Sequence, residues 1–295
     1  METLVFYIVN VFAEEKFTGN HLAVVLHVRR LSDTVLQQIA REIGPAAFIL
    51  SDQQNKGGYR VRIFTPNQEL AFSGHPVLGA AYIIQKEILR APVRTVELHL
   101  PAGPVQVALF YDEQEMVDHL SMQQQEATFG RTFERGEIAA LCHLSSVDID
   151  DRYPIQEVST GLPFIIVPLK TLEAIRRAKI VEGLYHDLIQ HTDAKALLLF
   201  CPETYNPWHH FHVRVFAGYY GVPEDPGTGS ANGAFAAYLV KHRYLGQAQI
   251  AGIQVEQGYL MERPSLLRLE AIEREGRITV AVGGRVIMVA RGVLF

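Results

Sequence analysis

The two halves of the chain repeat one order of elements, and this repeat limits the folds that the chain can adopt. In the first half VRIF at 61–64 leads to GHPVLGAAY at 74–82, and in the second half VRVF at 213–216 leads to GSANGAFAAY at 229–238. Each half combines a strand, a polar turn, a glycine at the helix entry and a helix ending in Ala-Ala-Tyr. Internal self-similarity of this kind marks structurally equivalent units, so the sequence predicts two halves of one fold.

A second, weaker similarity between the two halves supports the repeat. FTGNHLAVVL at 17–26 and STGLPFIIVPL at 159–169 both place a glycine turn before an apolar strand. A chain of 295 residues is also longer than one ordinary domain. We expect an N-terminal domain over 1–120, with the C-terminal strand 285–295 as a candidate to complete it, and a C-terminal domain over 121–284.

Most other segments are short runs rich in Val, Ile and Phe between turns, a pattern typical of β-strands. Helices are fewer. SDTVLQQIARE at 32–42 has one apolar face, with Ser32 as its N-cap and Gly44 as its stop signal, and another helix is predicted over 134–142. The predicted strands are 4–13, 21–27, 46–51, 58–64, 94–99, 104–110, 155–158, 163–168, 196–200, 210–216, 250–256, 266–272, 276–282 and 285–290.

The two helices of the repeat differ from the others in kind. PVLGAAYII at 76–84 and SANGAFAAYLV at 230–240 carry no charge on any side. A helix that is apolar all round must be buried all round, and its Gly and Ala residues let the surrounding backbone approach closely. The sequence therefore predicts an α+β fold of two pseudo-symmetric domains, each a β-barrel wrapped around a central α-helix.

Composition excludes several classes of protein. Hydrophobic residues make up 48% and charged residues 20%, which is typical of a globular chain and not of a disordered one. A net charge of −5 gives no basic surface for nucleic acid or an anionic membrane. The two cysteines, Cys142 and Cys201, fit no metal-binding spacing and are typical of a reducing cytoplasm. We expect a cytoplasmic protein with no metal, no nucleic-acid partner and no membrane association.

The starts of the two buried helices are candidate ligand sites. The first turn of a helix leaves unpaired N–H groups that carry partial positive charge. Both helices begin with a glycine, Gly74 and Gly229, so a ligand can come close to these amides, and a carboxylate or other small anion is the expected occupant. If the two halves face each other, both starts can open onto one cleft between domains, a preferred place for ligand sites.

Titratable groups lie at both starts. His75 is in the first turn of the first helix and Asp225 just precedes the second. The helix dipole disfavours protonated His75, and an apolar cleft would disfavour ionised Asp225, so this pair could move protons without a metal or cofactor. Two plain alternatives stay open, because Asp-Pro-Gly is ordinary turn chemistry and His75 before Pro76 can serve as a capping group.

Five segments together resemble the phenazine biosynthesis PhzF-like proteins, which share the fold of diaminopimelate epimerase. The segments run in family order along essentially the whole chain: FTGNHLAVVL (17–26), IARE (39–42), RIFTPNQELAFSGHPVLGAA (62–81), VSTGLPFIIVPL (158–169) and GVPEDPGTGSANG (221–233). The resemblance implies two similar domains with the active site in the cleft between them, a homodimer, and an isomerase that needs no cofactor. Its substrate would be a small carboxylate-bearing, amino acid-like metabolite, since the family's named member shifts a proton on a dihydro-hydroxyanthranilate.

The resemblance also implies which residues form the site. The family's polar site residues correspond to Gly74, His75, Asp225 and Ser230. We take Asp225 and His75 as the catalytic candidates. The predicted substrate-binding residues are Gly74, Gly229, Ser230, Ser73, Asn20 and Thr228. Related epimerases carry a cysteine at each helix start, whereas Ser73 and Gly227 lie near those places here, so we do not expect racemisation by two thiols.

One stretch departs from the family pattern. Members continue from the ARE motif to Ser-Glu-(Thr/Ser), and that Glu is their principal acid–base group. Here AREIGPAAFIL at 40–50 is shorter, with Pro45, Ala46 and Ala47 where the acid would stand. None of these three side chains can carry a proton, and Gly44-Pro45 is an ordinary helix stop.

Three outcomes of this loss stay open. His75 and Asp225 could suffice for a proton transfer, or Glu42 could be repositioned into the cleft. Otherwise the protein is a catalytically impaired binder of a small ligand on the same scaffold. For Glu42 we favour a position on the solvated face of its helix.

The histidine-rich segment WHHFHVRVF at 208–216 raises the question of a metal site. Strand geometry places His210 and His212 on one face and His209 on the other. Two histidines on one face can begin a metal site, but no acid or thiol lies nearby in the sequence. We therefore expect these histidines on the surface of a strand.

Overall fold

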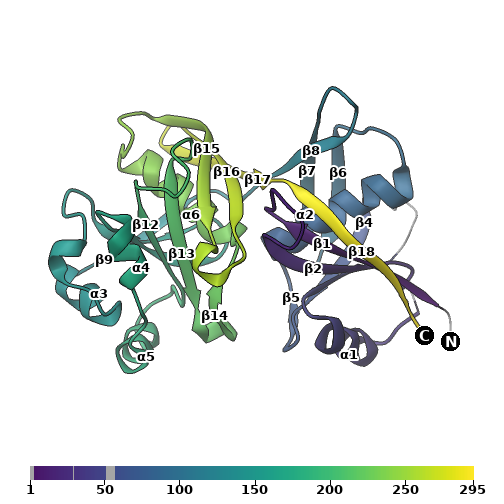
Figure 1. The fold of residues 1–295 in the computed structure, drawn as a ribbon, viewed down its shortest axis with the longest axis horizontal. Coiled ribbons are helices and arrows are strands. Elements are labelled where there is room, and N and C mark those ends of the chain that lie inside the picture. Colours follow the sequence, from purple (N-terminus) through teal and green to yellow (C-terminus); the bar gives the residue numbers. More distant parts are fainter. Residues whose placement is uncertain (1–2, 29, 51–56) are drawn as a thin grey trace. The chain divides into compact units, whose positions relative to one another are not determined.

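The computed structural model describes residues 3–28, 30–50 and 57–295, and the chain divides into two compact units (Figure 1). Unit 1 comprises Met1–Gln123 together with Gly283–Phe295, and unit 2 comprises Gln124–Val282. Ser51, the last residue of the predicted strand 46–51, lies outside the described residues. Within the described residues, no helix is both long enough and apolar enough to cross a bilayer.

In its described residues, unit 1 consists mainly of strands, with one outer helix and one buried helix. A π-helical segment, Ile84–Leu89, extends the buried helix α2. In chain order the elements are β1 (Leu4–Val11), β2 (Asn20–Val25), α1 (Asp33–Ile43), β3 (Ala46–Ile49), β4 (Tyr59–Phe64), β5 (Glu69–Leu70), α2 (Gly74–Ile83), β6 (Thr95–Leu100), β7 (Gly103–Tyr111), β8 (Val117–Gln123) and β18 (Val286–Leu294).

Unit 2 has the same kinds of elements and more outer helices. In chain order they are β9 (Thr128–Phe133), α3 (Arg135–Leu141), β10 (Ile155–Ser159), β11 (Pro163–Pro168), α4 (Leu172–Arg177), α5 (Glu182–Gln190), β12 (Leu197–Cys201), β13 (Phe211–Ala217), β14 (Val222–Asp225), α6 (Gly229–Lys241), β15 (Gln249–Gln257), β16 (Ser265–Arg274) and β17 (Arg277–Gly284).

Strand pairing confirms the predicted repeat. In unit 1, β1 pairs antiparallel with β2, β2 parallel with β3, β3 antiparallel with β4, β4 parallel with β6, and β6 antiparallel with β7. In unit 2 the strands β10, β11, β12, β13, β15 and β16 follow one another with the same sequence of orientations. The short strands β5 and β14 pair antiparallel with β4 and β13 respectively. Each VR(I/V)F motif therefore occupies the same strand of its unit.

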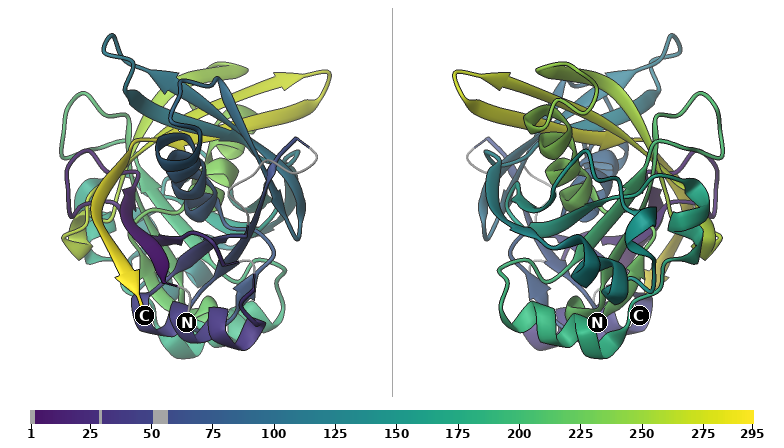
Figure 2. Two further views of the ribbon diagram at one scale, coloured as in Figure 1. Left: turned by 90° about the vertical axis from the view of Figure 1, so that its right-hand side faces the viewer. Right: turned by 90° about the vertical axis from the view of Figure 1, so that its left-hand side faces the viewer.

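The helices α2 and α6 are the cores of their units, as predicted. In α2 every residue except His75 is buried, and in α6 every residue except Ser230 and Lys241. The helix α2 contacts β1, β2, β3, β6, β7, β8 and β18, and α6 contacts β10, β11, β12, β15 and β16. Each sheet therefore curls around its own helix, and Figure 2 shows α2 and α6 encircled by the strands of their units. This arrangement confirms the predicted fold class.

Small residues make this enclosure possible. A Cβ atom at Gly79 of α2 would lie 2.4 Å from Leu22 Cδ2, and one at Gly233 of α6 would lie 1.9 Å from Gln124 Oε1. Both distances are far below van der Waals contact, so a side chain at either position would force its neighbour to move. The composition of these helices thus follows from how closely the strands and side chains approach them.

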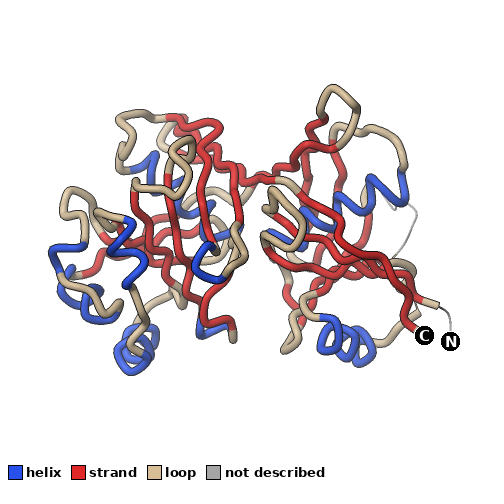
Figure 3. The backbone as a smooth tube through the Cα atoms, in the orientation of Figure 1, coloured by secondary structure: helices blue, strands red, loops and turns tan. Residues whose placement is uncertain are grey.

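The outer helix α1 has the termini that the sequence predicts. The Ser32 hydroxyl accepts a hydrogen bond from Val35 N at 3.4 Å, and Gly44 ends the helix with a φ of 91°. Leu36 and Ala40 pack into a second core with Ala23 and Phe48. Figure 3 shows α1 as a helix outside the strands of unit 1.

The predicted strands and the helix over 134–142 are confirmed, with small differences at their ends. The sequence reading missed the polar strands β8 and β9, and it missed α4 and α5. The sequence of β8, VDHLSMQ, lacks the apolar runs by which strands are recognised.

Candidate functional site

The starts of α2 and α6 share one unusual property. Neither N-cap residue, Ser73 or Thr228, makes a side-chain capping bond, and neither helix has an acidic residue in its first turn. Most helices satisfy their first N–H groups with such groups. The helix starts Gly74 and Gly229 are both buried, so an anion that reached either first turn would meet backbone amides at close range.

His75 is the chemically unusual residue at the start of α2. The side chain is only partly covered, but its Nε2 atom is buried and has no hydrogen-bond partner among the described residues. Burial, and to a smaller extent the neighbouring charge of His21, lower the pKa of His75 to about 3. The imidazole is therefore neutral at physiological pH, and an anion bound beside it would favour its protonated form. The sequence predicts a lowered pKa for His75 as well, but the main cause is burial and not the helix dipole.

His21 is a residue that the sequence reasoning missed. It is the second residue of β2, directly after Asn20, and its Nε2 atom lies 3.3 Å from the Ile43 carbonyl oxygen. Its ring is also 3.5 Å from the place where a Cβ of Gly44 would lie. The motif FTGNHL, with an imidazole next to a predicted binding residue, is the signal that could have identified it.

At the start of α6, a polar network surrounds Asp225. Asp225 ends β14 and is half-buried. The Thr228 hydroxyl donates a short hydrogen bond to its Oδ2 atom. The side-chain amide of Gln257 donates to the Asp225 carbonyl oxygen at 2.7 Å and to Thr228 Oγ1 at 2.9 Å. Asp225 is thus part of a fixed arrangement and not only a turn residue.

A second amide holds the first turn of α6 itself. Gln124 Nε2 donates to the Gly229 carbonyl oxygen at 2.9 Å, and the Thr160 hydroxyl donates to Gln124 Oε1 at 2.5 Å. Ser230 follows Gly229 in this turn and is half-buried. No local pattern in the sequence points to Gln124 or Thr160, because they lie 105 and 69 positions before Gly229.

The structure divides the predicted site residues between the two units. Unit 2 brings together Asp225, Thr228, Gly229 and Ser230 at the start of α6. Unit 1 contains Asn20, which is 6% exposed at the start of β2, and Ser73, Gly74 and His75 at the start of α2.

The stretch without an acid is apolar in the structure as well. Ala46 and Ala47 are fully buried in β3, and Pro45 O accepts a hydrogen bond from Ala23 N at 2.9 Å. Glu42 is exposed on α1, which is the position favoured from the sequence.

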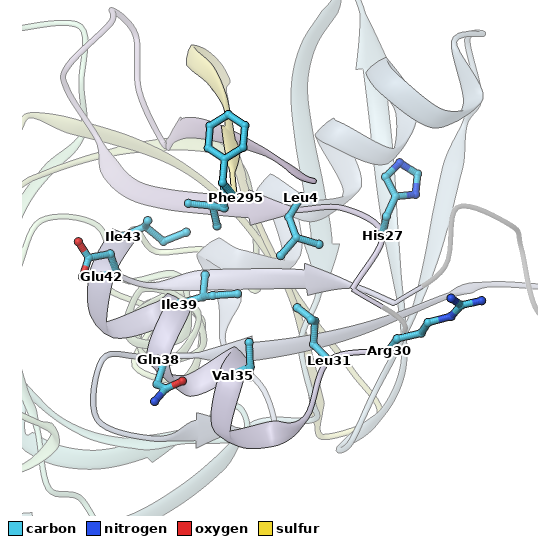
Figure 4. Close-up of a pocket in the computed structure, with 11 residues that line it drawn as sticks. Leu4, His27, Arg30, Leu31, Val35, Gln38, Ile39, Glu42, Ile43 and Phe295 are labelled. Carbon is cyan, nitrogen blue, oxygen red and sulfur yellow. The ribbon is translucent and has the colours of Figure 1, made fainter. Parts of the chain in front are cut away.

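Glu42 lines a separate hollow of about 510 Å³. Its floor is apolar and includes Leu4, Leu31 and Ile39, with Glu42 and Arg30 at its margin (Figure 4). None of the predicted catalytic or binding residues lines this hollow.

The expectation that the three histidines lie on a strand surface was wrong for two of them. His212 is completely buried, and His209 is mostly buried. Both bind Glu256, with His209 Nδ1 at 2.8 Å from Oε1 and His212 Nδ1 at 3.1 Å from Oε2. The acid comes from β15, 44 positions after His212, which is why the local sequence did not reveal it. Across the described residues no three His, Cys, Asp or Glu side chains are grouped to hold a metal ion.

The cysteines do not supply a reactive thiol. Both Cys142 and Cys201 are buried and unpaired, and burial raises the pKa of each thiol to about 12. A thiol with so high a pKa is a weak nucleophile and a weak base near neutral pH.

The model of the phenazine biosynthesis-like protein family matches residues 9–292 of the chain. An uncharacterized isomerase of Mesorhizobium japonicum is 31% identical over 304 residues that cover 100% of both chains. The trans-2,3-dihydro-3-hydroxyanthranilate isomerase of Pseudomonas aeruginosa is 31% identical over 295 residues, covering 95% of this chain and 98% of the relative.

Solved structures give the same result. The crystal structure of a PhzF-family phenazine biosynthesis protein from Bacillus anthracis superposes with a TM-score of 0.90 at 25% identity and covers 100% of both chains. Two units with the same strand order, each curled around a buried helix, are thus found together with a sequence match over nearly the whole length. The chain belongs to the phenazine biosynthesis-like protein family and is a PhzF-like isomerase.

Proposed function

We propose that this isomerase shifts a proton, without a cofactor, between two atoms of a small amino acid-like carboxylate. The relative from Pseudomonas aeruginosa is named for trans-2,3-dihydro-3-hydroxyanthranilate. That compound and other cyclic amino acids are therefore the first substrates to test.

The observation that carries the proposal is His75. A buried imidazole nitrogen without a partner among the described residues is costly unless a ligand or water completes it. It lies in the first turn of a helix whose amides suit a carboxylate. A neutral base beside an anion site is the combination that abstraction of a proton from an amino acid-like substrate requires.

In the proposed reaction, the first-turn amides at Gly74 and Gly229 and the Ser230 hydroxyl hold the anionic group of the substrate. Ser73, Asn20 and Thr228 complete the binding set. His75 takes a proton from one carbon, and the electron pair of that C–H bond moves into the substrate's π-system. A proton then returns to a different carbon. Asp225 is the second acid–base group, and no oxidant or reductant is needed.

Two further properties belong to the same proposal. We expect a homodimer, as the resemblance implies, and sedimentation analysis tests it directly. We also expect the protein in the cytoplasm, which the two unpaired cysteines support.

One observation favours a second candidate, a protein that binds the same ligands without catalysis. The stretch in which the family carries its acid holds only Pro45, Ala46 and Ala47 here, and Glu42 is exposed on α1. In this case the helix starts would bind an anion, but no proton would exchange.

Exchange in D₂O separates the two candidates. The protein is incubated with trans-2,3-dihydro-3-hydroxyanthranilate and with a panel of cyclic amino acids, and NMR follows deuterium incorporation at carbon. Catalysis predicts exchange that is lost in His75→Ala and in Asp225→Asn. Ligand binding detected by calorimetry, with no exchange on any compound, would instead support the binder.

A further inference from the structure

The last residues of β15 organise the approach to α6. Glu256 and Gln257 are fully buried side by side at the end of this strand, and Gly258 follows with a φ of 77°. Glu256 binds His209 and His212, whereas Gln257 faces the segment that carries Asp225.

Gln257 uses its full hydrogen-bonding capacity on this segment. Its Nε2 donates to the Asp225 carbonyl oxygen at 2.7 Å and to Thr228 Oγ1 at 2.9 Å. Its Oε1 accepts from Thr228 N at 3.1 Å and from Asn232 Nδ2 at 2.9 Å. A side-chain amide has two donor hydrogens and an acceptor oxygen with two lone pairs, so all four are used.

These partners fix the orientation of the amide. A backbone carbonyl oxygen can only accept and a backbone N–H can only donate. Nε2 must therefore face Asp225 O, and Oε1 must face Thr228 N. A rotated amide would place oxygen against oxygen and N–H against N–H.

The orientation of the amide then sets the direction of the Thr228 hydroxyl. Thr228 Oγ1 accepts from Gln257 Nε2, so its own hydrogen is available for another acceptor. That acceptor is Asp225 Oδ2. A donor relay thus runs from Gln257 through Thr228 to the Asp225 carboxylate.

Close backbone packing keeps Gln257 in place. A Cβ at Gly258 would lie 2.6 Å from the Pro226 carbonyl oxygen and 2.4 Å from that of Arg263. The strand end therefore touches the Asp-Pro-Gly turn itself. Asn232, completely buried in α6, closes the network by donating to Thr228 O at 3.0 Å.

From this geometry we infer that Gln257 is a positioning residue for Asp225, which it acts on through the Thr228 hydroxyl. The inference rests on the proposed function, in which Asp225 is an acid–base group. Gln257 holds the carbonyl of Asp225 and orients the donor on its carboxylate. It thereby sets both the position of this carboxylate and its affinity for a proton.

Gln257→Glu removes the donor half of the amide and adds one negative charge, whereas Thr228→Val removes the relay hydroxyl without adding charge, so the two variants together are decisive. The introduced carboxylate still accepts from Thr228 N and Asn232 Nδ2, but it cannot donate to Thr228 Oγ1. The Thr228 hydroxyl then turns away from Asp225, whose carboxylate loses a hydrogen bond. A hydrogen bond donated to a carboxylate stabilises its ionised form. Losing this bond should therefore raise the titration midpoint of Asp225 by about one pH unit.

Carboxyl-carbon NMR of Asp225 measures this midpoint without any substrate. The expected result is an upward shift in Gln257→Glu and a similar one in Thr228→Val, with no shift in Gln249→Glu, a matched control at the exposed beginning of β15. The Thr228 amide signal reports whether the acceptor half is kept. In the exchange assay Gln257→Glu lowers kcat roughly tenfold or more, because the position of the acid–base group is lost.

An Asp225 midpoint that is the same in wild type and Gln257→Glu would overturn the inference. If Gln257→Glu does not fold, Thr228→Val tests the same link. A wild-type protein that exchanges no proton on any compound would contradict the proposed function. It would leave the inference on Gln257 standing, because the Asp225 titration is measured without substrate.

Discussion

Arg214 and Glu224 form an ion pair with two parallel hydrogen bonds. Arg214 Nε lies 2.8 Å from Glu224 Oε1, and Nη2 lies 2.8 Å from Oε2. In the other half of the repeat, Arg62 binds Glu69 in the same way at 2.7 and 2.6 Å. In both pairs the arginine belongs to the VR(I/V)F strand and the acid to the short strand beside it. Glu224, the first acid of the EDPG segment, is therefore held in a structural ion pair, and the proposed function assigns the chemistry to Asp225.

The third nitrogen of each arginine fastens an outer helix. Arg214 Nη1 donates to the carbonyl oxygens of Ile175 and Ala178 at the end of α4, and Arg62 Nη1 binds Asp33 at the start of α1. We predict that Arg214→Met lowers the free energy of unfolding by about 3 kcal/mol, because it leaves Glu224, whose side chain is 17% exposed, without its partner. The control is Arg135→Gln, which breaks an exposed ion pair with Asp151 and should change the free energy of unfolding by less than about 1 kcal/mol. Urea unfolding measures both, and equal losses would contradict the buried role of Arg214.

The loss of folding stability at low pH should depend on His75. Its pKa in the folded protein is about 3, below the ordinary value of 6.5, so the unfolded chain binds the proton more readily. The stability from a neutral His75 is complete above pH 6.5 and is lost as the pH falls from 6.5 towards 3. Between pH 7 and pH 5 this loss is about 1–2 kcal/mol for a partly covered side chain. In urea unfolding, the free energy of unfolding should fall between pH 7 and pH 5 by about 1–2 kcal/mol less in His75→Gln than in wild type. His186→Gln, at an exposed histidine, should behave as wild type.

His21 should influence the titration of His75. Its charge lowers the pKa of His75, so removing that charge in His21→Gln should raise the pKa of His75 towards its ordinary value. Burial is the larger cause, and most of the depression should therefore remain. Imidazole NMR as a function of pH measures the shift. A His75 titration that is the same in His21→Gln and wild type would show that the two rings do not interact.

The tight contact at Gly233 can be tested by adding one methyl group. A Cβ there would meet the Gln124 amide at 1.9 Å, so Gly233→Ala must displace Gln124 from the Gly229 carbonyl oxygen. We expect a loss of about 1–3 kcal/mol in the free energy of unfolding, despite the better helix propensity of alanine. Gly136→Ala in α3 is the matched control, since no atom lies within 4 Å of a Cβ there. If both variants were equally stable, the fit around α6 would be looser than described.

The sequence was informative where a pattern is local. The repeat, the uncharged helices α2 and α6, and the termini of α1 each follow from neighbouring residues, and the structure has all of them. It was uninformative where a contact joins distant positions. The bond of Glu256 to His212 spans 44 positions and that of Gln257 to Asp225 spans 32, and neither strand carries a motif that points to its partner. Polar strands such as β8 were missed for a different reason, because their burial depends on what packs against them.

The central claim is that His75 and Asp225 act in one reaction, and a double-mutant cycle on proton exchange tests it most directly. Exchange of the best substrate in D₂O is measured for wild type, His75→Gln, Asp225→Asn and the double variant. If the two groups serve one reaction, each single change should lower the rate by roughly a hundredfold or more, and the double variant should be scarcely slower than either single one. Rates that fall independently and multiply, or a single variant that exchanges as fast as wild type, would contradict the account.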